Sequence, residues 1–400
     1  MIPLHEARQY VLDRVARLDS VMVPVAEAGG LVLAADVVAA EQVPPFANTA
    51  MDGFAVRAGD TDGAPVTLEM IGTIAAGATL DGEVGPGQAA RIMTGAPMPR
   101  GADAVVMVEK TELDEAAGTV AIEITVPEGN HVRHAGEDVE PGDRLFSAGT
   151  RLTAGHLGVL SSVGVREVPV VRRPRVGVVS TGDELVDDDR PLQPGEIRDS
   201  NRRTLLTLVE ESGWEAVDLG IAVDEPDAIR DAFLSGAESC DAILSSGGVS
   251  MGAFDYVKVV LDEIGDMRWM QIAIKPAKPF AFGLIGATPV FGLPGNPVSS
   301  MVSFELFARP AIRFMAGDDD TDLPLIRAIS EDSLGHDADG KTHFMRVEGR
   351  VDETGRWHVR RAGGQGSHQL TAMARADALA LSPDGAVIES GDEVEILPLR

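Results

Sequence analysis

The chain contains very little cysteine: Cys240 is the one cysteine among its 400 residues. A single thiol cannot form an intramolecular disulfide framework, and it cannot build a metal cluster from several thiolates. Both classes of stabilising cross-link are therefore excluded within the chain. Such sparing use of cysteine is typical of a reducing compartment, so we expect a cytoplasmic protein.

Long apolar runs are also missing. No uninterrupted stretch reaches the ~18 apolar residues of a membrane-spanning helix, and the opening segment MIPLHEARQYVLDRVARLDS lacks the apolar core of a signal peptide. Within that segment, helical spacing relates Leu4, Ala7, Val11, Val15 and Leu18. We expect one amphipathic helix over the first twenty residues and a soluble protein with no membrane partner.

Basic residues are scarce, and lysine most of all. The chain has 34 basic and 63 acidic residues, a formal net charge of −29, which repels nucleic acid and anionic membrane surfaces. We therefore expect no nucleic-acid partner. If the substrate is an anion, the few lysines must be concentrated near it; they are Lys110, Lys258, Lys275, Lys278 and Lys341.

Aromatic residues make up only 4% of the chain, but 44% is hydrophobic and 44 residues are glycine, as in a folded chain of many short elements and turns. The length predicts several domains. Short apolar stretches at 66–71 and 104–108 between turn signals indicate a β-rich region. The predicted division is an N-terminal helix and connector (1–40 and 141–170), a glycine-rich β domain (41–140), an α/β domain (171–318) and a small β domain (319–400).

The α/β region shows the clearest pattern. Strand-like stretches alternate with helix-like stretches, which predicts a parallel sheet with helices on both faces. The expected strands are 176–179, 216–220, 242–245 and 289–292, and the expected helices are 201–212, 226–236, 257–264 and 298–314. In such a sheet the ligand crevice lies outside the carboxyl ends of the strands.

Two glycine-containing loops follow these strands. SSGGVSMG, with Ser246, Gly247, Gly248 and Ser250, allows close approach of a phosphate, although a simple turn is the better explanation of an isolated pair of glycines. It is neither a dinucleotide fingerprint nor a Walker loop. LPGNPVSS contains Pro294 and Pro297, which predict a rigid loop and a helix N-terminus that can hold an anion.

The charged candidates lie at the same predicted edge. In IKPAKPF, Lys275 and Lys278 are each followed by proline, and in so acidic a chain this pair is better explained by binding a polyanion than as a solvated surface. Glu184, Asp224 and Asp255 follow predicted strands. Each acid alone is an ordinary exposed acid or helix cap, whereas together they suggest Mg²⁺ beside phosphates.

The β-rich region adds Asp52, Thr94 and Asp138, each in a glycine-flanked loop. Turn formation alone accounts for that composition, so these residues carry no chemistry by themselves. The histidines include no HExxH motif, and the pair His131 and His134 is weak support for zinc.

Taken together, several motifs resemble one family. They are PPFANTAMDGFAV, RIMTGAPMPRGADAVV, RHAGEDV, VVSTGDEL, GEIRDSN, SSGGVSMGAFDYV, IKPAKPFAFG and FGLPGNPVSS, in this order. They are similar to the molybdopterin molybdenumtransferases, the family of MoeA and of the gephyrin E domain. This resemblance implies a multidomain α/β plus β fold: a molybdopterin-binding three-layer α/β domain with a parallel-rich sheet, a glycine-rich β domain, a helical and extended linker domain and a C-terminal small β-barrel.

The resemblance also implies a reaction and partners. The reaction is insertion of molybdate into the dithiolene of adenylylated molybdopterin, with Mg²⁺-dependent release of AMP, by a cytoplasmic homodimer. Further partners would be the molybdopterin adenylyltransferase and molybdoenzyme maturation proteins. The alternatives are the preceding adenylylation step and a scaffold role like that of gephyrin. The sequence does not distinguish molybdate from tungstate as the substrate, because the two oxyanions have nearly the same size and charge.

Site residues follow from the matching motifs. The implied functional polar set is Asp52, Thr94, Asp138, Glu184, Asp224 and Asp255, with Asp224, Asp255 and Glu184 as candidate Mg²⁺ ligands. Substrate contacts are expected from Ser246, Gly247, Gly248, Ser250, Lys275, Lys278, Pro294, Pro297, Arg346 and Ser367. The chain departs from the family at Thr49, often Ser, and at Phe54, often Tyr, where a hydroxyl is lost.

Overall fold

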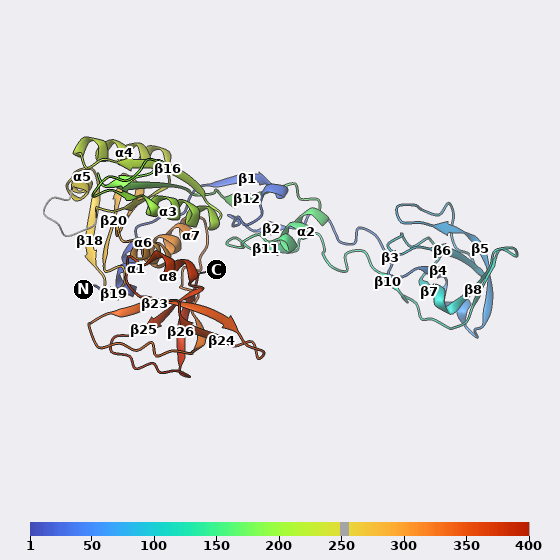
Figure 1. Cartoon of the computed structure of the whole chain (residues 1–400). Coiled ribbons are helices and arrows are strands. Elements are labelled where there is room, and N and C mark those ends of the chain that lie inside the picture. The colour runs from blue at the N-terminus through green and yellow to red at the C-terminus, as the bar shows by residue number, and fades with distance from the viewer. Residues whose placement is uncertain (249–255, 400) are drawn as a thin grey trace. The chain divides into compact units, whose positions relative to one another are not determined.

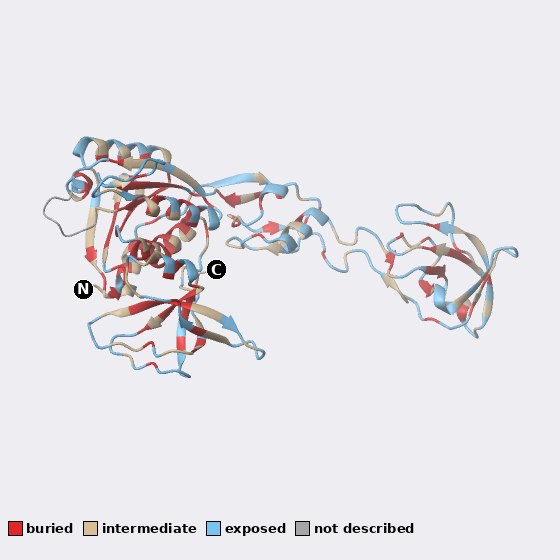
Figure 2. Ribbon diagram, in the orientation of Figure 1, coloured by how far each residue is buried: buried red, intermediate tan, exposed pale blue. Residues whose placement is uncertain are grey.

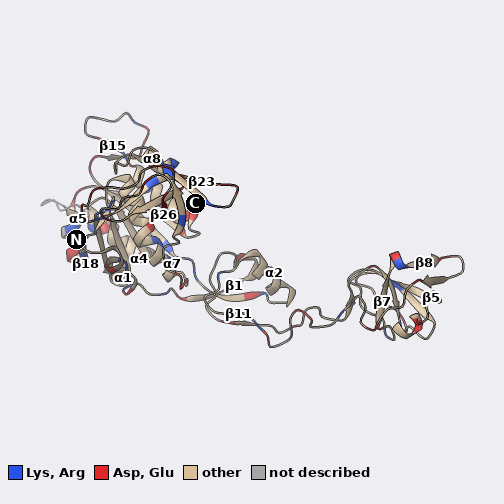
Figure 3. Ribbon diagram, turned by 90° about the horizontal axis from the view of Figure 1, so that it is seen from below, with Lys and Arg blue, Asp and Glu red and all other residues tan. Residues whose placement is uncertain are grey.

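The computed structural model describes residues 1–248 and 256–399. The chain divides into two compact units. Unit 1 comprises Met1–Val21, Gly30–Ala34 and Pro169–Arg400, and unit 2 comprises Met22–Gly29 and Ala35–Val168. Strands β1 (Ser20–Pro24) and β12 (Glu167–Val171) lie where the chain passes from one unit to the other. Basic and acidic residues occur on elements of both units (Figure 3).

Unit 2 is built on a six-stranded sheet in the order β7-β4-β6-β5-β9-β8. Its strands are β4 (Gly53–Val56), β5 (Val66–Ile74), β6 (Gln88–Ile92), β7 (Ala104–Met107), β8 (Thr111–Asp114) and β9 (Thr119–Ile122). The strands expected at 66–71 and 104–108 are confirmed. Residues of β4 alternate between two apolar clusters, Phe54 in one and Ala55 in the other, because successive side chains of a strand point to opposite faces.

The remaining elements of unit 2 are short. They are η1 (Val25–Glu27), β2 (Val37–Val38), β3 (Asn48–Thr49), η2 (Ala58–Thr61), η3 (Val108–Lys110), β10 (Val132–Arg133), β11 (Arg144–Phe146) and α2 (Ala154–Ser162). Two-stranded pairings join β3 to β10 and β2 to β11. The first pairing brings together segments near the two ends of the predicted β region, and the second joins the segments that flank it.

Unit 1 contains the predicted parallel sheet. Its strand order is β16-β13-β17-β21-β20-β18, with β13 (Arg175–Thr181), β16 (Glu215–Ala222), β17 (Ala242–Ser246) and β21 (Thr288–Leu293) parallel to one another. These are the four strands expected from the sequence. The hairpin of β18 (Asp266–Gln271) and β20 (Pro279–Ile285) extends the sheet with antiparallel strands that the sequence pattern did not predict.

Helices cover both faces of this sheet (Figure 1). α4 (Pro226–Ser239) and α5 (Tyr256–Ile264) pack on one face, in a cluster with Phe233, Val257 and Ile243. On the other face lie α1 (Leu4–Leu12), α3 (Ser200–Glu211), α6 (Pro297–Ser303) and α7 (Arg309–Met315). Figure 2 shows the sheet strands largely buried between these layers. The expected helices at 201–212, 226–236 and 257–264 are confirmed within a few residues at their ends.

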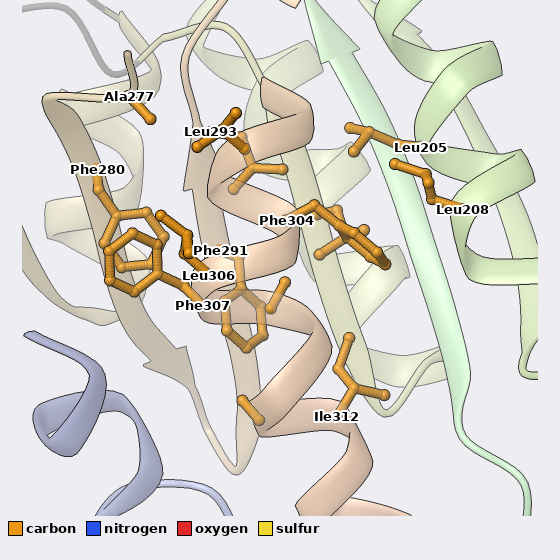
Figure 4. Close-up of a cluster of buried hydrophobic side chains, with 14 of the residues drawn as sticks. Leu205, Leu208, Ala277, Phe280, Phe291, Leu293, Phe304, Leu306, Phe307 and Ile312 are labelled. Carbon is orange, nitrogen blue, oxygen red and sulfur yellow. The ribbon is translucent and has the colours of Figure 1, made fainter. Parts of the chain in front are cut away.

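The larger core is rich in phenylalanine (Figure 4). Phe280 of β20 stacks on Phe307 with ring centroids 4.2 Å apart, and Phe304 lies beside Leu205 of α3 in the same cluster. Phe304–Ala308 forms the π-helical turn η4 between α6 and α7. The single helix predicted over 298–314 is therefore helical throughout but carries a π-helical insertion, which sequence periodicity does not reveal.

The C-terminal region of unit 1 is a closed barrel. β22 (Ile326–Ser330), β23 (Thr342–Val351), β24 (Trp357–Arg361), β25 (Ala378–Ser382) and β26 (Glu393–Pro398) follow the order β23-β24-β22-β26-β25, and β25 also pairs with β23. α8 (Leu370–Arg375) precedes β25. Short strands β14 (Leu185–Val186), β15 (Ile197–Arg198) and β19 (Ile274–Lys275) complete the unit. The expected small β-barrel is confirmed, as is the multidomain α/β plus β fold.

The N-terminal helix is shorter than predicted. α1 ends at Leu12, so a single helix over the first twenty residues is wrong. Val15 and Leu18 still pack into the core, which explains the continued apolar period, but the Leu18 N–H donates to the Met315 carbonyl rather than to its own helix. No helix within residues 1–248 or 256–399 is long and apolar enough to span a bilayer. The proposed domain boundaries remain a prediction.

Candidate functional site

The carboxyl ends of the parallel strands in unit 1 lie level with one another. Thr181 of β13 is in register with Ala222 of β16, and Ser246 of β17 is in register with Leu293 of β21. The loops that leave these strands therefore start at one edge of the sheet, as the sequence predicted. This edge brings together the loops that carry Glu184, Asp224, Ser246 and Pro294.

The turn after β17 requires glycine. Gly247 and Gly248 have φ values of +99° and +65°, a region that other residues enter at a cost. A Cβ on Gly247 would lie 2.9 Å from the Thr181 carbonyl oxygen, and one on Gly248 would collide with the Cβ of Val257. The Gly247 N–H donates to the Leu293 carbonyl at 3.1 Å, so this amide bonds the neighbouring strand. Ser250 and Asp255, predicted for the same loop, lie outside the described residues.

The loop after β21 is held against this turn by Asn201 of α3. The Asn201 side-chain Nδ2 donates to Ser246 Oγ at 2.8 Å and to the Gly295 carbonyl at 2.7 Å. Pro294 is buried, and Pro297 occupies the first turn of α6, where its missing N–H has no consequence. The double-proline loop therefore leads directly into a helix N-terminus at the sheet edge.

Two predicted acids lie at the other end of the same edge. Glu184 and Asp224 are exposed and follow β13 and β16, which are neighbours. The Asp224 N–H donates to Asp183 Oδ1 at 2.9 Å, which ties the two loops together. A Cβ on Gly182 would meet the Glu184 carboxylate, so this carboxylate lies directly over Gly182 and would have to move if position 182 carried a side chain. Carboxylate oxygens are the donor type that Mg²⁺ prefers, but among the described residues these acids do not form a group of three possible ligands.

The two lysines lie beyond β21 at this edge. β20 runs antiparallel to β21 with Ala281 opposite Gly292, so the start of β20 is level with the end of β21. Lys278 immediately precedes β20, and Lys275 is the last residue of β19. Both lie in the connection from β18 to β20, across which the Ile272 N–H donates to the Lys278 carbonyl at 2.7 Å. Both lysines are exposed. The structure thus brings the lysine pair to the edge where the glycine loops begin.

Arg346 and Ser367 come from the barrel. Arg346 is fully buried at 0% exposure, and its Nη2 donates to the carbonyls of Gly364 at 2.8 Å and Gly366 at 3.2 Å. Burial lowers its pKa from the ordinary value. The Ser367 carbonyl accepts a bond of 3.2 Å from the Val298 N–H in the first turn of α6. Arg346 therefore shapes a loop that contacts the helix after Pro297.

Asp52, Thr94 and Asp138 belong to unit 2. Asp52 Oδ1 accepts a bond of 2.7 Å from the Thr94 hydroxyl and one of 2.6 Å from the Thr94 N–H. These two bonds hold the pKa of Asp52 below its ordinary value. Asp138 is exposed, and its N–H donates to the Val43 carbonyl at 2.9 Å. The structure thus joins Asp52 directly to Thr94, and it places Asp138 in a different loop of the unit.

The first turn of α3 contains residues that the sequence analysis did not single out as site residues. Besides Asn201, the Asp199 side chain caps α3 through the Arg202 N–H and accepts from Ser180 Oγ, each at 3.1 Å. Burial disfavours the charge of Arg202, but bonds to Asp218 and Asp199 raise its pKa. The motif RDSN before a predicted helix signals a cap. No sequence signal shows that Asn201 reaches two other loops.

Comparison with known proteins covers the whole chain. The MoeA N-terminal region (domain I and II) matches residues 2–164, a probable molybdopterin binding domain matches 177–313, and the MoeA C-terminal region (domain IV) matches 335–399. The chain is 37% identical to the molybdopterin molybdenumtransferase of Haemophilus influenzae over 100% of this chain and 99% of that protein. It is 38% identical to molybdopterin molybdenumtransferase 2 of Mycobacterium tuberculosis, with 100% of each chain covered.

The fold agrees with a solved relative. The crystal structure of the molybdopterin biosynthesis MoeA protein from Pyrococcus horikoshii is similar with a TM-score of 0.82, at 29% identity and with 99% of each chain covered. The motifs that carried the resemblance in the sequence are thus matched along the full length in both sequence and structure. The chain belongs to the MoeA family of molybdopterin molybdenumtransferases.

Proposed function

We propose that this chain inserts molybdate into the dithiolene of adenylylated molybdopterin and releases AMP in a Mg²⁺-dependent reaction. The arrangement of charge along the sheet edge in unit 1 is the observation that carries this proposal. In strand order, Asp224 follows β16, Glu184 follows β13, the glycine turn follows β17, the proline loop follows β21, and the lysines precede β20. The edge therefore has carboxylates at one end and lysines at the other. Between them lie the glycine turn and the proline loop, which a phosphate can approach closely.

The length of this edge suits an extended substrate. Neighbouring strands are about 4.8 Å apart, so four intervals from β16 to β20 span about 19 Å. A pterin joined through a diphosphate to adenosine is long enough to lie along such an edge. Gly247 and Gly248 let the backbone of the turn pass close to Thr181 and Val257, where a Cβ would collide, and a turn without side chains at these two positions suits a nearby diphosphate.

Glu184 and Asp224 would hold Mg²⁺, together with Asp255, which lies outside the described residues. When bound, the ion would neutralise charge on the phosphate oxygens and so favour the loss of AMP. Glu184 is directed over Gly182 at the end of β13, and Asp224 is fixed through its N–H to Asp183. The chain's own contribution is to keep these carboxylates beside the neighbouring turn after β17.

Lys275 and Lys278 would bind the oxyanion, either molybdate itself or the terminal pterin phosphate. Ser367 lies on the barrel loop that contacts the first turn of α6, whose N-terminus also favours an anion. We propose that Arg346 acts on the proposed anion site through the loop at 363–369, since its guanidinium is buried against the carbonyls of that loop.

Asp52, Thr94 and Asp138 are proposed as further polar groups of the reaction, as their place in the family motifs implies. We also propose a cytoplasmic homodimer, with the adenylyltransferase and molybdoenzyme maturation proteins as partners. Adenylylation of molybdopterin and a gephyrin-like scaffold role are less well supported, because the full-length relatives are named molybdenumtransferases.

The test is to mix the protein with adenylylated molybdopterin, Mg²⁺ and molybdate, and to measure AMP and molybdenum-loaded cofactor. We expect AMP release that requires molybdate and stops when Mg²⁺ is removed with a chelator. Absence of molybdate-dependent AMP release from substrate that a known relative turns over would refute the proposal. Conversion of molybdopterin and ATP to the adenylylated form would instead support the adenylyltransferase alternative.

A further inference from the structure

We propose that Asn201 is a positioning residue that holds together the two neighbouring loops that follow β17 and β21 at the substrate crevice. This inference rests on the proposed function only in calling the crevice a substrate site. Asn201 lies in the first turn of α3, outside the candidate residues drawn from the sequence, and is 9% exposed. Its side-chain amide is therefore fixed by its partners rather than by water.

The orientation of this amide follows from its neighbours. The Gly295 carbonyl oxygen can only accept a hydrogen bond, so the Asn201 nitrogen and not its oxygen must face it. The same nitrogen donates to Ser246 Oγ, which is 3% exposed. Both hydrogens of one amide group are thus used, one on the loop after β17 and one on the loop after β21.

The two loops are also close to each other. A Cβ on Gly295 would lie 3.9 Å from the Gly247 Cα, and the Gly247 N–H donates to the Leu293 carbonyl. The backbone bond fixes the strand ends, but Gly295 lies two residues beyond it. The Asn201 bond holds this part of the proline loop, and it comes from a third element, α3.

α3 is itself anchored to a neighbouring strand. The Asp199 carboxylate caps the helix and accepts from Ser180 Oγ of β13, while Arg202 bonds Asp199 and Asp218. The first turn of α3 therefore contacts β13 through Asp199, the turn after β17 through Ser246, and the loop after β21 through Gly295. A rigid helix end connected to three adjacent strands can fix loop spacing to the fraction of an ångström that a reactive geometry needs.

Asn201→Asp is the decisive variant because it keeps the size of the side chain but replaces the donors by a carboxylate. That carboxylate would repel the Gly295 carbonyl. We expect faster backbone hydrogen exchange at 242–248 and 293–297, and a fall in kcat/KM on the order of 100-fold. Exchange in the barrel strands should stay unchanged. Asn130→Asp is the matched control, since Asn130 Nδ2 also donates to a backbone carbonyl, that of Val105 at 2.8 Å, in unit 2.

Ser246→Ala provides a second variant should Asn201→Asp fail to fold by circular dichroism and gel filtration. It removes one acceptor and leaves the Gly295 bond, so we expect faster exchange at 242–248 alone. In a double-mutant cycle, adding Ser246→Ala to Asn201→Asp should cost far less in kcat/KM than Ser246→Ala does in the wild type. A general loss of stability would not produce this coupling.

The outcomes separate the two proposals. Unchanged hydrogen exchange in both loops of a folded Asn201→Asp protein would overturn the positioning role. If Asn201→Asp does not fold, unchanged hydrogen exchange at 242–248 in Ser246→Ala would overturn it instead. Absence of molybdate-dependent AMP release from the wild type would refute the proposed function. In that case the exchange measurements alone still decide whether Asn201 fixes the loops.

Discussion

Thr94 donates two hydrogen bonds to the same oxygen of Asp52, although the two residues are 42 positions apart in the chain. Hydrogen bonds to the charged form of a carboxyl favour that form and lower its pKa. Asp52 is therefore held ionised by a partner from a separate loop. This pairing gives a physical relationship to two residues that composition alone had left as ordinary turn residues.

Replacing Thr94 with valine should raise the pKa of Asp52 towards its ordinary value, because the hydroxyl bond is lost while the N–H bond remains. Carbon-13 NMR titration of the Asp52 carboxyl measures this shift, and Thr94→Ser should preserve the wild-type value. A depressed carboxyl pKa stabilises the fold above the ordinary pKa, and that stability is lost as pH falls. The Thr94→Val protein should therefore lose less stability than wild type between pH 5 and pH 3; an equal loss would contradict this account.

Replacing both Lys275 and Lys278 with glutamine should weaken binding of molybdate by about tenfold or more. A charge-assisted hydrogen bond contributes about 1.5–3 kcal/mol, and about 1.4 kcal/mol corresponds to tenfold in affinity. Calorimetric titration with molybdate measures the effect. Lys110→Gln, at an exposed lysine of unit 2, is the control. If the double variant binds molybdate as tightly as the wild type does, the two lysines are ordinary solvent-exposed residues.

Arg346→Met should destabilise the protein by about 1–3 kcal/mol, because the carbonyls of Gly364 and Gly366 lose their buried donor. Urea unfolding of the whole chain measures this change. Arg360→Met is a matched control, since the Arg360 side chain is 64% exposed and its ion pair with Glu348 is screened by solvent and contributes little to stability. A stable Arg346→Met protein that no longer binds molybdate would instead indicate direct contact between Arg346 and the anion.

Gly248→Ala should be more destabilising than Gly286→Ala. Both glycines have positive φ, +65° and +59°, and alanine pays about 1–2 kcal/mol for that conformation at either position. Only at Gly248 does the added Cβ also collide with Val257, whereas the space around Gly286 is open. Comparison of the unfolding free energies isolates the collision. Equal losses would show that the turn after β17 can shift to admit a side chain.

His343 should make the protein less stable in mild acid. Burial lowers the pKa of His343, and its bond of 3.2 Å to Asp339 only partly opposes that effect. The unfolded chain therefore takes up a proton near pH 6.5 that the folded chain resists, so stability falls as pH drops below about 6.5. The carboxyl of Asp339, with its pKa lowered to about 2, remains charged in this range.

His343→Phe keeps an aromatic ring against His336, whose ring stacks at 3.4 Å, but removes the titrating group. Its denaturation midpoint should vary less between pH 7.5 and pH 5.5 than that of wild type. His5→Phe, at an exposed histidine of α1, controls for loss of a histidine elsewhere. If both variants follow the wild-type curve, protonation of His343 does not limit acid stability.

The parallel sheet could be predicted from sequence because alternation of strand and helix is a local, repeated signal. The loops that follow 176–179, 216–220, 242–245 and 289–292 lie at one edge for the same reason, since parallel strands share a direction. The hairpin of β18 and β20 was missed because its residues surround the unusual IKPAKPF segment, which indicated only extended chain. That hairpin nevertheless determines where the lysines lie.

Contacts between distant segments could not be predicted. The helical spacing of apolar residues continues through Val15 and Leu18 because both side chains are packed into the core. A non-helical segment can bury residues at the same spacing, so the predicted helix is longer than the observed α1. The family resemblance implies a substrate contact for Arg346, but the burial of its side chain against the loop carbonyls depends on the fold of the barrel, which no sequence pattern reveals. The two bonds of Asn201 likewise depend on three elements meeting in space.

The antiparallel direction of β20 has a further consequence for the direction in which a ligand can lie along the sheet edge. Had that strand been parallel, the loop of Lys275 and Lys278 would begin at the opposite edge, and both ends of the crevice would be acidic or neutral. With the observed course, a ligand that carries a metal-bound diphosphate at its head and an oxyanion at its tail meets favourable charge in one direction only. The reversed ligand would place its tail on Asp224 and Glu184, where like charges repel.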